Sequence, residues 1–148
     1  MVTERALANR ATIARPAWAT RSLRSLMLAT DVGFVLYWSI TATHLLPSAW
    51  LFKNYASATM QAWNWSFLPL DLVVSATGLA ALWRLSRNHP SAAPLALISL
   101  ASTSASGLMA ISFWALNSDF ALGWWTPNLF LLLYPLPFLR AIASASRS

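Results

Sequence analysis

Long apolar runs separated by short polar segments make up most of this chain. Four of these runs approach the roughly 20 apolar residues that a helix needs to cross a bilayer. They cover residues 25–46, 67–85, 93–116 and 124–143. A basic segment, residues 1–24, precedes the first run, and residues 144–148 follow the last. The pattern predicts an all-α membrane protein whose four transmembrane helices (residues 25–143) form an antiparallel bundle.

Polar residues and prolines mark the expected ends of these helices. Ser66 and Thr126 are suited to cap the second and fourth helices, because a hydroxyl side chain accepts a hydrogen bond from the first turn. Pro69 and Pro127 then fall in first turns, where a missing N–H is harmless. Pro135 lies inside the fourth run, so we expect a kink there. Between the first two runs, residues 47–66 are rich in aromatic side chains and carry one charge, which predicts a short segment lying on the membrane surface.

Charged side chains are scarce and unevenly placed. Of the 148 residues, 57% are hydrophobic and 9% are charged, whereas soluble domains carry roughly 25% charged residues. Nine of the ten basic residues lie before the first run, around the end of the second, or near and after the end of the fourth. The positive-inside rule therefore predicts that both termini are cytoplasmic. We interpret the net charge of +6 as a ring of arginines at anionic headgroups, and not as a nucleic-acid-binding surface.

Asp71 is the most informative polar residue, because it lies inside the second run, directly after the sequence WNWSFLPL. A charged aspartate facing lipid is unfavourable by roughly 2.5–3.5 kcal/mol. We therefore expect Asp71 to face the interior of the bundle. Trp63 and Trp65 precede it at the level of the headgroups, which is typical of an aromatic belt.

Two further polar residues are expected near the depth of Asp71. Counting a rise of about 1.5 Å per residue from each helix end places His44 and Asn128 at this level. We predict a polar layer of Asp71, His44 and Asn128, with Tyr37 or Tyr134 beneath it, that holds a proton or recognises a cation or a polar headgroup. The plainer alternatives are an Asp71 that only hydrogen-bonds between helices and a His44 that is solvated at a helix end.

A second acid, Asp31, lies near the inner end of the first run. It should be about 10 Å or more from the outer layer along the membrane normal, so the two acids should not form a pair. Arg84 is its expected partner, most simply in a structural salt bridge. The third run carries a stripe of small residues, which predicts close helix packing. The stripe comprises Ser99, Ser102, Thr103, Ser106 and Ala110.

The motifs DVGFVLYW (residues 31–38) and WNWSFLPLD (residues 63–71) resemble those of the YvaD-like bacterial membrane proteins, a family of unknown function. The resemblance covers all four expected helices and leaves the basic N-terminal segment outside. It implies a small bacterial four-helix membrane protein in the inner membrane, and it implies no activity. An organellar membrane is the alternative location, because the N-terminal segment also has the composition of a transit peptide. It is less favoured, because the distribution of arginines fits a cytoplasmic tail.

The candidate chemistry leaves three functions open. The favoured one is a small transporter or ligand-binding protein that uses Asp71, His44 and Asn128, with Asp31, Tyr37, Trp63 and Trp65 as further candidates. The second is an accessory subunit of a membrane complex, and the third is an enzyme acting on a lipid. The absence of cysteine and of any metal-ligand spacing predicts no metal and no cofactor. The expected partners are the bilayer and either further copies of this chain or another membrane protein.

Overall fold

The computed structural model describes residues 16–47, 52 and 54–145, and this described part consists of helices and the turns between them. The helices are α2 (Arg21–Thr43), α4 (Ala58–Trp65), α5 (Leu68–Ser86), α6 (Ala92–Leu116), α7 (Leu122–Leu133) and α8 (Pro135–Ala145). Four segments are long and apolar enough to cross a membrane, namely α2, α4 with α5, α6, and α7 with α8. The prediction of an all-helical chain with four such segments is confirmed.

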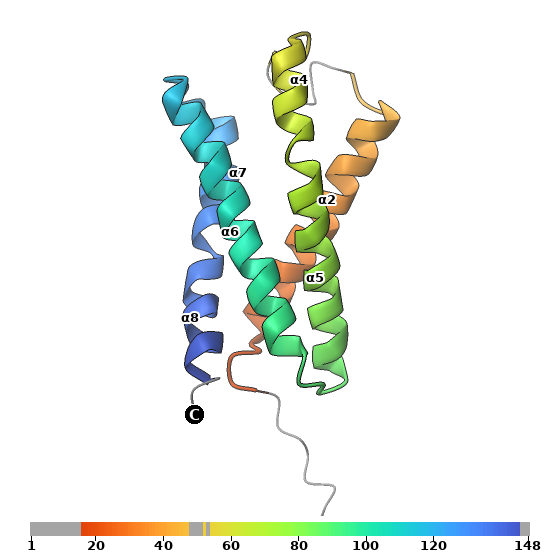
Figure 1. Cartoon of the computed structure of the whole chain (residues 1–148), viewed down its shortest axis with the longest axis vertical. Helices are drawn as coiled ribbons and strands as arrows, with labels where there is room; N and C mark the ends of the chain where they lie inside the picture. The colour runs from red at the N-terminus through yellow and green to blue at the C-terminus, as the bar shows by residue number, and fades with distance from the viewer. Residues whose placement is uncertain (1–15, 48–51, 53, 146–148) are drawn as a thin grey trace, which may run out of the picture.

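The second segment begins earlier than expected. The structure continues it upward as α4, which stands directly above α5 in the side view (Figure 1). Ser66 therefore does not cap α5, and its hydroxyl instead donates to the Trp63 carbonyl at 2.6 Å. Pro69 lies in the first turn of α5, as predicted. The expectation of a surface segment over residues 47–66 is wrong for its second half, while residues 48–51 and 53 lie outside the described residues.

The fourth segment is divided at the predicted proline. α7 ends at Leu133 and α8 begins at Pro135, which confirms the expected break. The Ser104 hydroxyl of α6 donates to the Leu132 carbonyl at 2.7 Å, next to this break. However, α7 begins at Leu122, so Pro127 lies inside the helix and the predicted cap at Thr126 is wrong.

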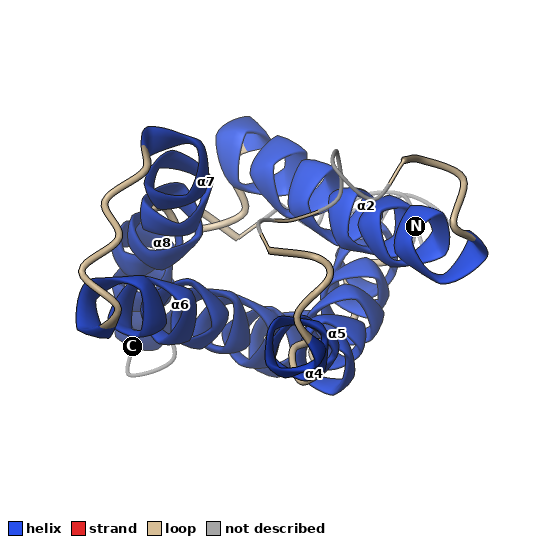
Figure 2. Cartoon of the chain, turned by 90° about the horizontal axis from the view of Figure 1, so that it is seen from above, coloured by secondary structure: helices blue, strands red, loops and turns tan. Residues whose placement is uncertain are grey.

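The helices pack closely at one end of the molecule and diverge at the other (Figure 1). α2 packs on α5, α5 on α6, and α6 on both α7 and α8. At the closed end the core includes Leu23, Met27, Leu100 and Ile142, each no more than 2% exposed. Seen from above, α2, α5, α6 and α7 surround the axis of the bundle (Figure 2). The open end is where the candidate site lies.

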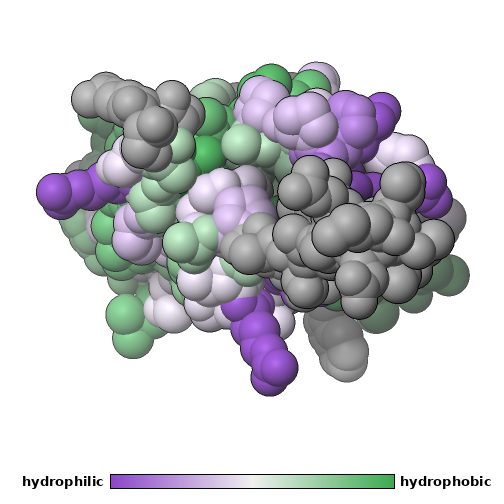
Figure 3. Space-filling view, turned by 90° about the horizontal axis from the view of Figure 1, so that it is seen from below, coloured by the Kyte–Doolittle hydropathy of each residue, from purple (hydrophilic) through white to green (hydrophobic). Residues whose placement is uncertain are grey.

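The closed end is also the basic end. Seen from this side, long hydrophilic side chains project from a largely apolar or neutral surface (Figure 3). Five described arginines belong to the elements at this end, four of them at helix ends and one within α8. They are Arg21, Arg24, Arg84, Arg87 and Arg140. Along the helices, large apolar side chains such as Leu36, Leu72, Leu108 and Phe130 are exposed.

Candidate functional site

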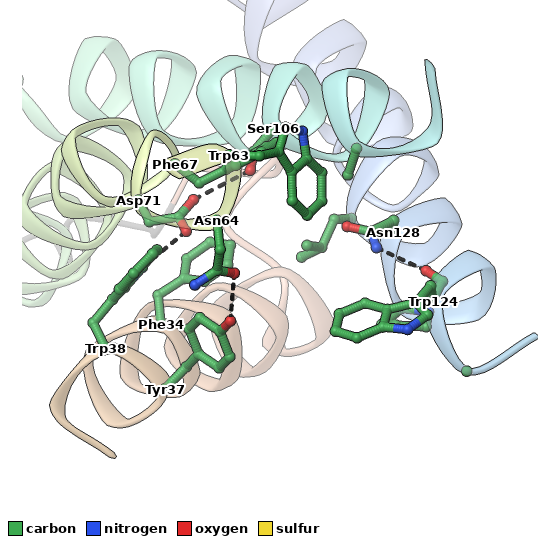
Figure 4. Close-up of a pocket in the computed structure, with 14 residues that line it drawn as sticks. Phe34, Tyr37, Trp38, Trp63, Asn64, Phe67, Asp71, Ser106, Trp124 and Asn128 are labelled. Atoms are coloured by element: carbon green, nitrogen blue, oxygen red, sulfur yellow. Dashed lines mark hydrogen bonds between the residues drawn. The ribbon is translucent and has the colours of Figure 1, made fainter. Parts of the chain in front are cut away.

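A cavity of about 320 Å³ lies between the diverging helices, and we call it the Asp71 pocket. α2, α4, α5, α6 and α7 all contribute to it. Its aromatic lining comprises Phe34, Tyr37, Trp38, Trp63, Phe67 and Trp124. Its polar lining comprises Asn64, Asp71, Ser106 and Asn128 (Figure 4). Asp71 is the one charged residue among the described residues that line it.

Asp71 is held in the first turn of α5 by donors from two other helices. The indole Nε1 of Trp38 donates to Oδ2 at 3.0 Å, and the hydroxyl of Ser106 donates to Oδ1 at 3.2 Å. The side chain is only 4% exposed. Both donors are neutral, so they orient the carboxyl group but supply no countercharge to it (Figure 4).

Asn64 forms a second polar contact beside Asp71. The Tyr37 hydroxyl donates to Asn64 Oδ1 at 2.7 Å. Asn64 Nδ2 is buried and has no hydrogen-bond partner in the described part of the chain. A phenol hydroxyl accepts as well as donates, so the Asn64 amide can also be flipped, with its Nδ2 donating to the Tyr37 hydroxyl. One end of the Asn64 amide is therefore free in either orientation.

A network of aromatic rings fixes the wall opposite Asp71. Trp63 stacks on Phe113 with centroids 4.3 Å apart, and Trp114 stacks on Trp124 at 5.7 Å. Trp63 and Trp114 meet edge to face at 5.4 Å, which joins the two stacks. Such contacts restrict ring rotation, so the aromatic wall is organised before any ligand binds.

Asn128 lies on the α7 side of the Asp71 pocket. Its Nδ2 donates to the Trp124 carbonyl at 2.7 Å, and its amide oxygen is turned towards the space between the helices (Figure 4). α7 approaches α6 closely here, because a Cβ on Gly107 would lie only 2.6 Å from the Asn128 carbonyl oxygen. The missing side chain at position 107 thus allows the backbone of α7 at Asn128 to approach α6.

The structure brings together Asp71, Tyr37, Asn128 and Trp63. It leaves three other candidates, Trp65, His44 and Asp31, outside the pocket lining. Trp65 packs on Trp38 with centroids 5.3 Å apart.

His44 is exposed at the end of α2, where Nδ1 lies 3.4 Å from the Tyr55 hydroxyl. The predicted layer of Asp71 with His44 is therefore wrong. A similar depth along the bundle does not bring His44 close to Asp71, because α2 leans away from the axis at this end, as Figure 1 shows.

Asp31 is 1% exposed and faces α5, where its carboxyl group occupies the space left by the missing side chain of Gly78. Its backbone carbonyl accepts from the Ser75 hydroxyl at 3.0 Å. Its Oδ2 has no hydrogen-bond partner among the described residues. The predicted pair with Arg84 is wrong, since the Arg84 guanidinium lies over the Trp83 ring, 4.9 Å from its centroid.

The remaining tyrosine of the predicted layer, Tyr134, belongs to the level of Asp31. It lies beside the side chains of Thr30 and Thr103, close to Asp31. The structure thus holds two polar levels, one around Asp71 and one around Asp31. Only the first opens onto the cavity.

Sequence reasoning missed Trp38 and Ser106, which bind Asp71 directly. Ser106 was assigned to helix packing because it belongs to a stripe of small residues. Trp38 follows Asp31 by seven positions, a spacing that keeps two residues on one helix face. That spacing was the available signal that Trp38 also points inward.

Comparison with known proteins identifies relatives without an assigned activity. Residues 23–148 match a family described as "Family of unknown function (DUF5360)". Over 127 residues the chain is 45% identical to the "Uncharacterized protein YvaD" of Bacillus subtilis (strain 168). That alignment covers 86% of this chain and 96% of the relative. No solved structure matches the chain. The resemblance to YvaD-like proteins is confirmed, and the relative is bacterial.

Proposed function

This chain belongs to the DUF5360 family of unknown function, and from its own geometry we propose that it is a small integral membrane protein that binds a ligand at Asp71. It acts either as a binding protein or as a small transporter. The observation that carries the proposal is a buried, oriented carboxyl group at the edge of a cavity of about 320 Å³.

The outer surface supports insertion into a bacterial inner membrane. Soluble monomers rarely expose large contiguous apolar patches, whereas here Leu36, Leu72 and Leu108 are each at least half exposed. The five arginines at the basic end favour a cytoplasmic location for that end. The Asp71 pocket would then lie in the outer half of the membrane.

The pocket has the features of a small-molecule site. Ligand cavities are typically about 300–1,000 Å³ and combine apolar walls with a few convergent polar groups. Here the polar groups are Asp71, Asn64 and Asn128. Ionisable residues inside membrane segments are costly and commonly mark ligand or ion pathways. An acid–base pair of Asp71 and His44, which a lipid-modifying enzyme would use, is not assembled.

A second buried acid favours transport over binding alone. Asp71 contacts Trp38, and Asp31 faces Gly78, so the two levels are seven positions apart on both α2 and α5. This spacing corresponds to about 10 Å along the helices. Acids at successive depths are an arrangement that proton- or ion-coupled transporters use.

Native mass spectrometry of the protein purified in mild detergent tests the proposal. We expect a small-molecule adduct on the wild type that is absent from Asp71→Asn. The amide keeps the shape of the carboxyl group, accepts from Trp38 and donates to Ser106, so the fold should survive. Asp119→Asn is the matched control, because Asp119 is an acid outside the pocket lining.

Two results would count against ligand binding at Asp71. The first is an identical set of adducts on the wild type and on Asp71→Asn. The second is a wild-type spectrum that contains a stoichiometric partner chain and no small molecule. The second result would favour the accessory-subunit function instead.

A further inference from the structure

The chemistry of the Asp71 pocket also indicates a class of ligand. Building on the proposed function, we infer that the pocket binds a small organic cation, an ammonium group whose apolar substituents lie against the aromatic wall. The argument uses the charge of the lining, its ring composition and its free polar atoms.

An ionised Asp71 gives the described lining a negative charge, and no described residue of that lining offsets it. Asp71 is the one charged residue among the described residues that line the cavity, and its two hydrogen-bond donors, Trp38 and Ser106, are neutral. The nearest described arginines along the chain belong to the basic end, at the opposite end of the bundle. An anionic ligand would meet a carboxylate with no positive group beside it in the described lining. A cation would supply the missing countercharge.

The rings suit an organic cation better than a metal ion. Trp63, Trp124 and Tyr37 lie around the cavity (Figure 4), and aromatic faces attract ammonium groups through the ring quadrupole, tryptophan most strongly. Hard metal cations instead need about six oxygen ligands. Within the described part of the chain, no cluster of three or more histidine or acidic side chains is placed to hold a metal ion.

Two amides complete the site. The Asn128 amide oxygen is turned towards the cavity, while its Nδ2 is held by the Trp124 carbonyl. Asn64 can present its own oxygen if its Nδ2 takes the Tyr37 hydroxyl as acceptor. Ammonium N–H groups, or the polarised C–H groups of a quaternary ammonium, can then contact an oxygen on either side of the cavity.

The test compares two probes of the same shape. Benzyltrimethylammonium is the cation, and neopentylbenzene, which has carbon in place of nitrogen, is its neutral isostere. Equilibrium dialysis against full-length protein in phosphatidylglycerol nanodiscs, corrected with protein-free nanodiscs, gives both affinities. We expect the cation to bind at least about tenfold more tightly than its isostere.

Variants assign that preference to its source. Asp71→Asn should lower the cation preference to what the rings alone provide while the neutral isostere binds as before. Asp119→Asn should leave both affinities unchanged. Trp124→Phe should weaken cation binding, and Trp124→Leu should weaken it more, because the ring contributes even where Asp71 is intact. These variants keep the test decisive should Asp71→Asn fail to fold.

Nanodiscs with and without phosphatidylethanolamine distinguish two sources of an ammonium group, a lipid headgroup and a free cation. Adding phosphatidylethanolamine to the nanodiscs should weaken probe binding if the natural ligand is a lipid headgroup, and should leave it unchanged if the ligand is a free cation. Equal affinity for the two probes would overturn the cation inference and leave a ligand-binding pocket standing. Failure of the cation to bind the wild type would also overturn the inference, and the adduct experiment would then decide the proposed function separately.

Discussion

Asp31 and Asp71 are both almost fully buried, but their surroundings differ. Asp71 receives one donor on each carboxyl oxygen, from Trp38 and from Ser106. Asp31 has an oxygen without a partner among the described residues and rests against the bare backbone of Gly78. The first arrangement orients a carboxyl group towards a cavity, and the second encloses one.

The first prediction concerns Asp31 and Arg84, which do not form an ion pair. Arg84 lies six positions beyond Gly78 on α5, or about 9 Å along the helix. In a double-mutant cycle of Asp31→Asn with Arg84→Ala, the losses in the free energy of unfolding should add within about 0.5 kcal/mol. Thermal melts in detergent, calibrated for unfolding enthalpy, provide the measurement. A coupling above about 1 kcal/mol would mean that the two residues interact.

At this scale the sequence was sufficient to place the acids but not their partners. The inward orientation of Asp71 followed from the cost of a charge in lipid. The separation of the two acids followed from the rise per residue, and the contacts on α2 and α5 agree with it. The choice of partner depends on how each helix is rotated and tilted. Charge alone favoured His44 as the partner of Asp71 and Arg84 as the partner of Asp31. The donors to Asp71 are instead neutral.

At the scale of helices, two glycines allow two close approaches. Gly78 accommodates the Asp31 carboxyl group between α2 and α5. Gly107 allows the backbone of α7 to approach α6, next to the hydrogen bond from Ser104 to Leu132. Without a hydrophobic driving force between helices in lipid, such small residues and interhelical hydrogen bonds determine which helices pack.

The second prediction is that Gly107→Ala destabilises the protein by roughly 1–3 kcal/mol, the range for overpacking a tight contact. The added Cβ would lie 2.6 Å from the Asn128 carbonyl oxygen, which is backbone and cannot rotate away. Unfolding in a denaturing detergent would measure the loss.

Gly33→Ala is the matched control for this prediction. Gly33 is also inside a helix, but no described atom lies within 4 Å of a Cβ built on it. The substitution should be neutral or stabilising by up to about 1 kcal/mol, because alanine favours the helix. Equal effects at positions 33 and 107 would show that α6 and α7 are not in close contact.

The helices themselves were largely predictable, and their ends were less so. Pro135 marked a break because it removes a backbone donor wherever the chain is helical. Thr126 and Ser66 resembled caps, yet α7 starts at Leu122 and α4 continues up to Ser66. Hydroxyl residues also donate to the preceding turn inside helices and at their C-terminal ends, as Ser66 does to Trp63 at the end of α4. A hydroxyl one to three residues before a proline therefore did not identify a helix start.

The whole molecule has two unlike ends. The basic end contains the packed apolar core, including Leu23 and Ile142. The open end contains the aromatic wall and the Asp71 pocket. If the basic end faces the cytoplasm, as proposed, a ligand reaches Asp71 from the outside.

The last prediction tests this orientation with single cysteines, which is straightforward because the chain has no native cysteine. Gly123 is exposed and lines the pocket, and no described atom lies within 4 Å of a Cβ built there, so Gly123→Cys should fold normally. In intact cells this thiol should react with a maleimide that cannot cross the membrane. Ser86→Cys, at the exposed end of α5, should react only after the cells are permeabilised. The opposite pattern would reverse the orientation, and reaction at both sites in sealed cells would contradict a bundle that spans the membrane.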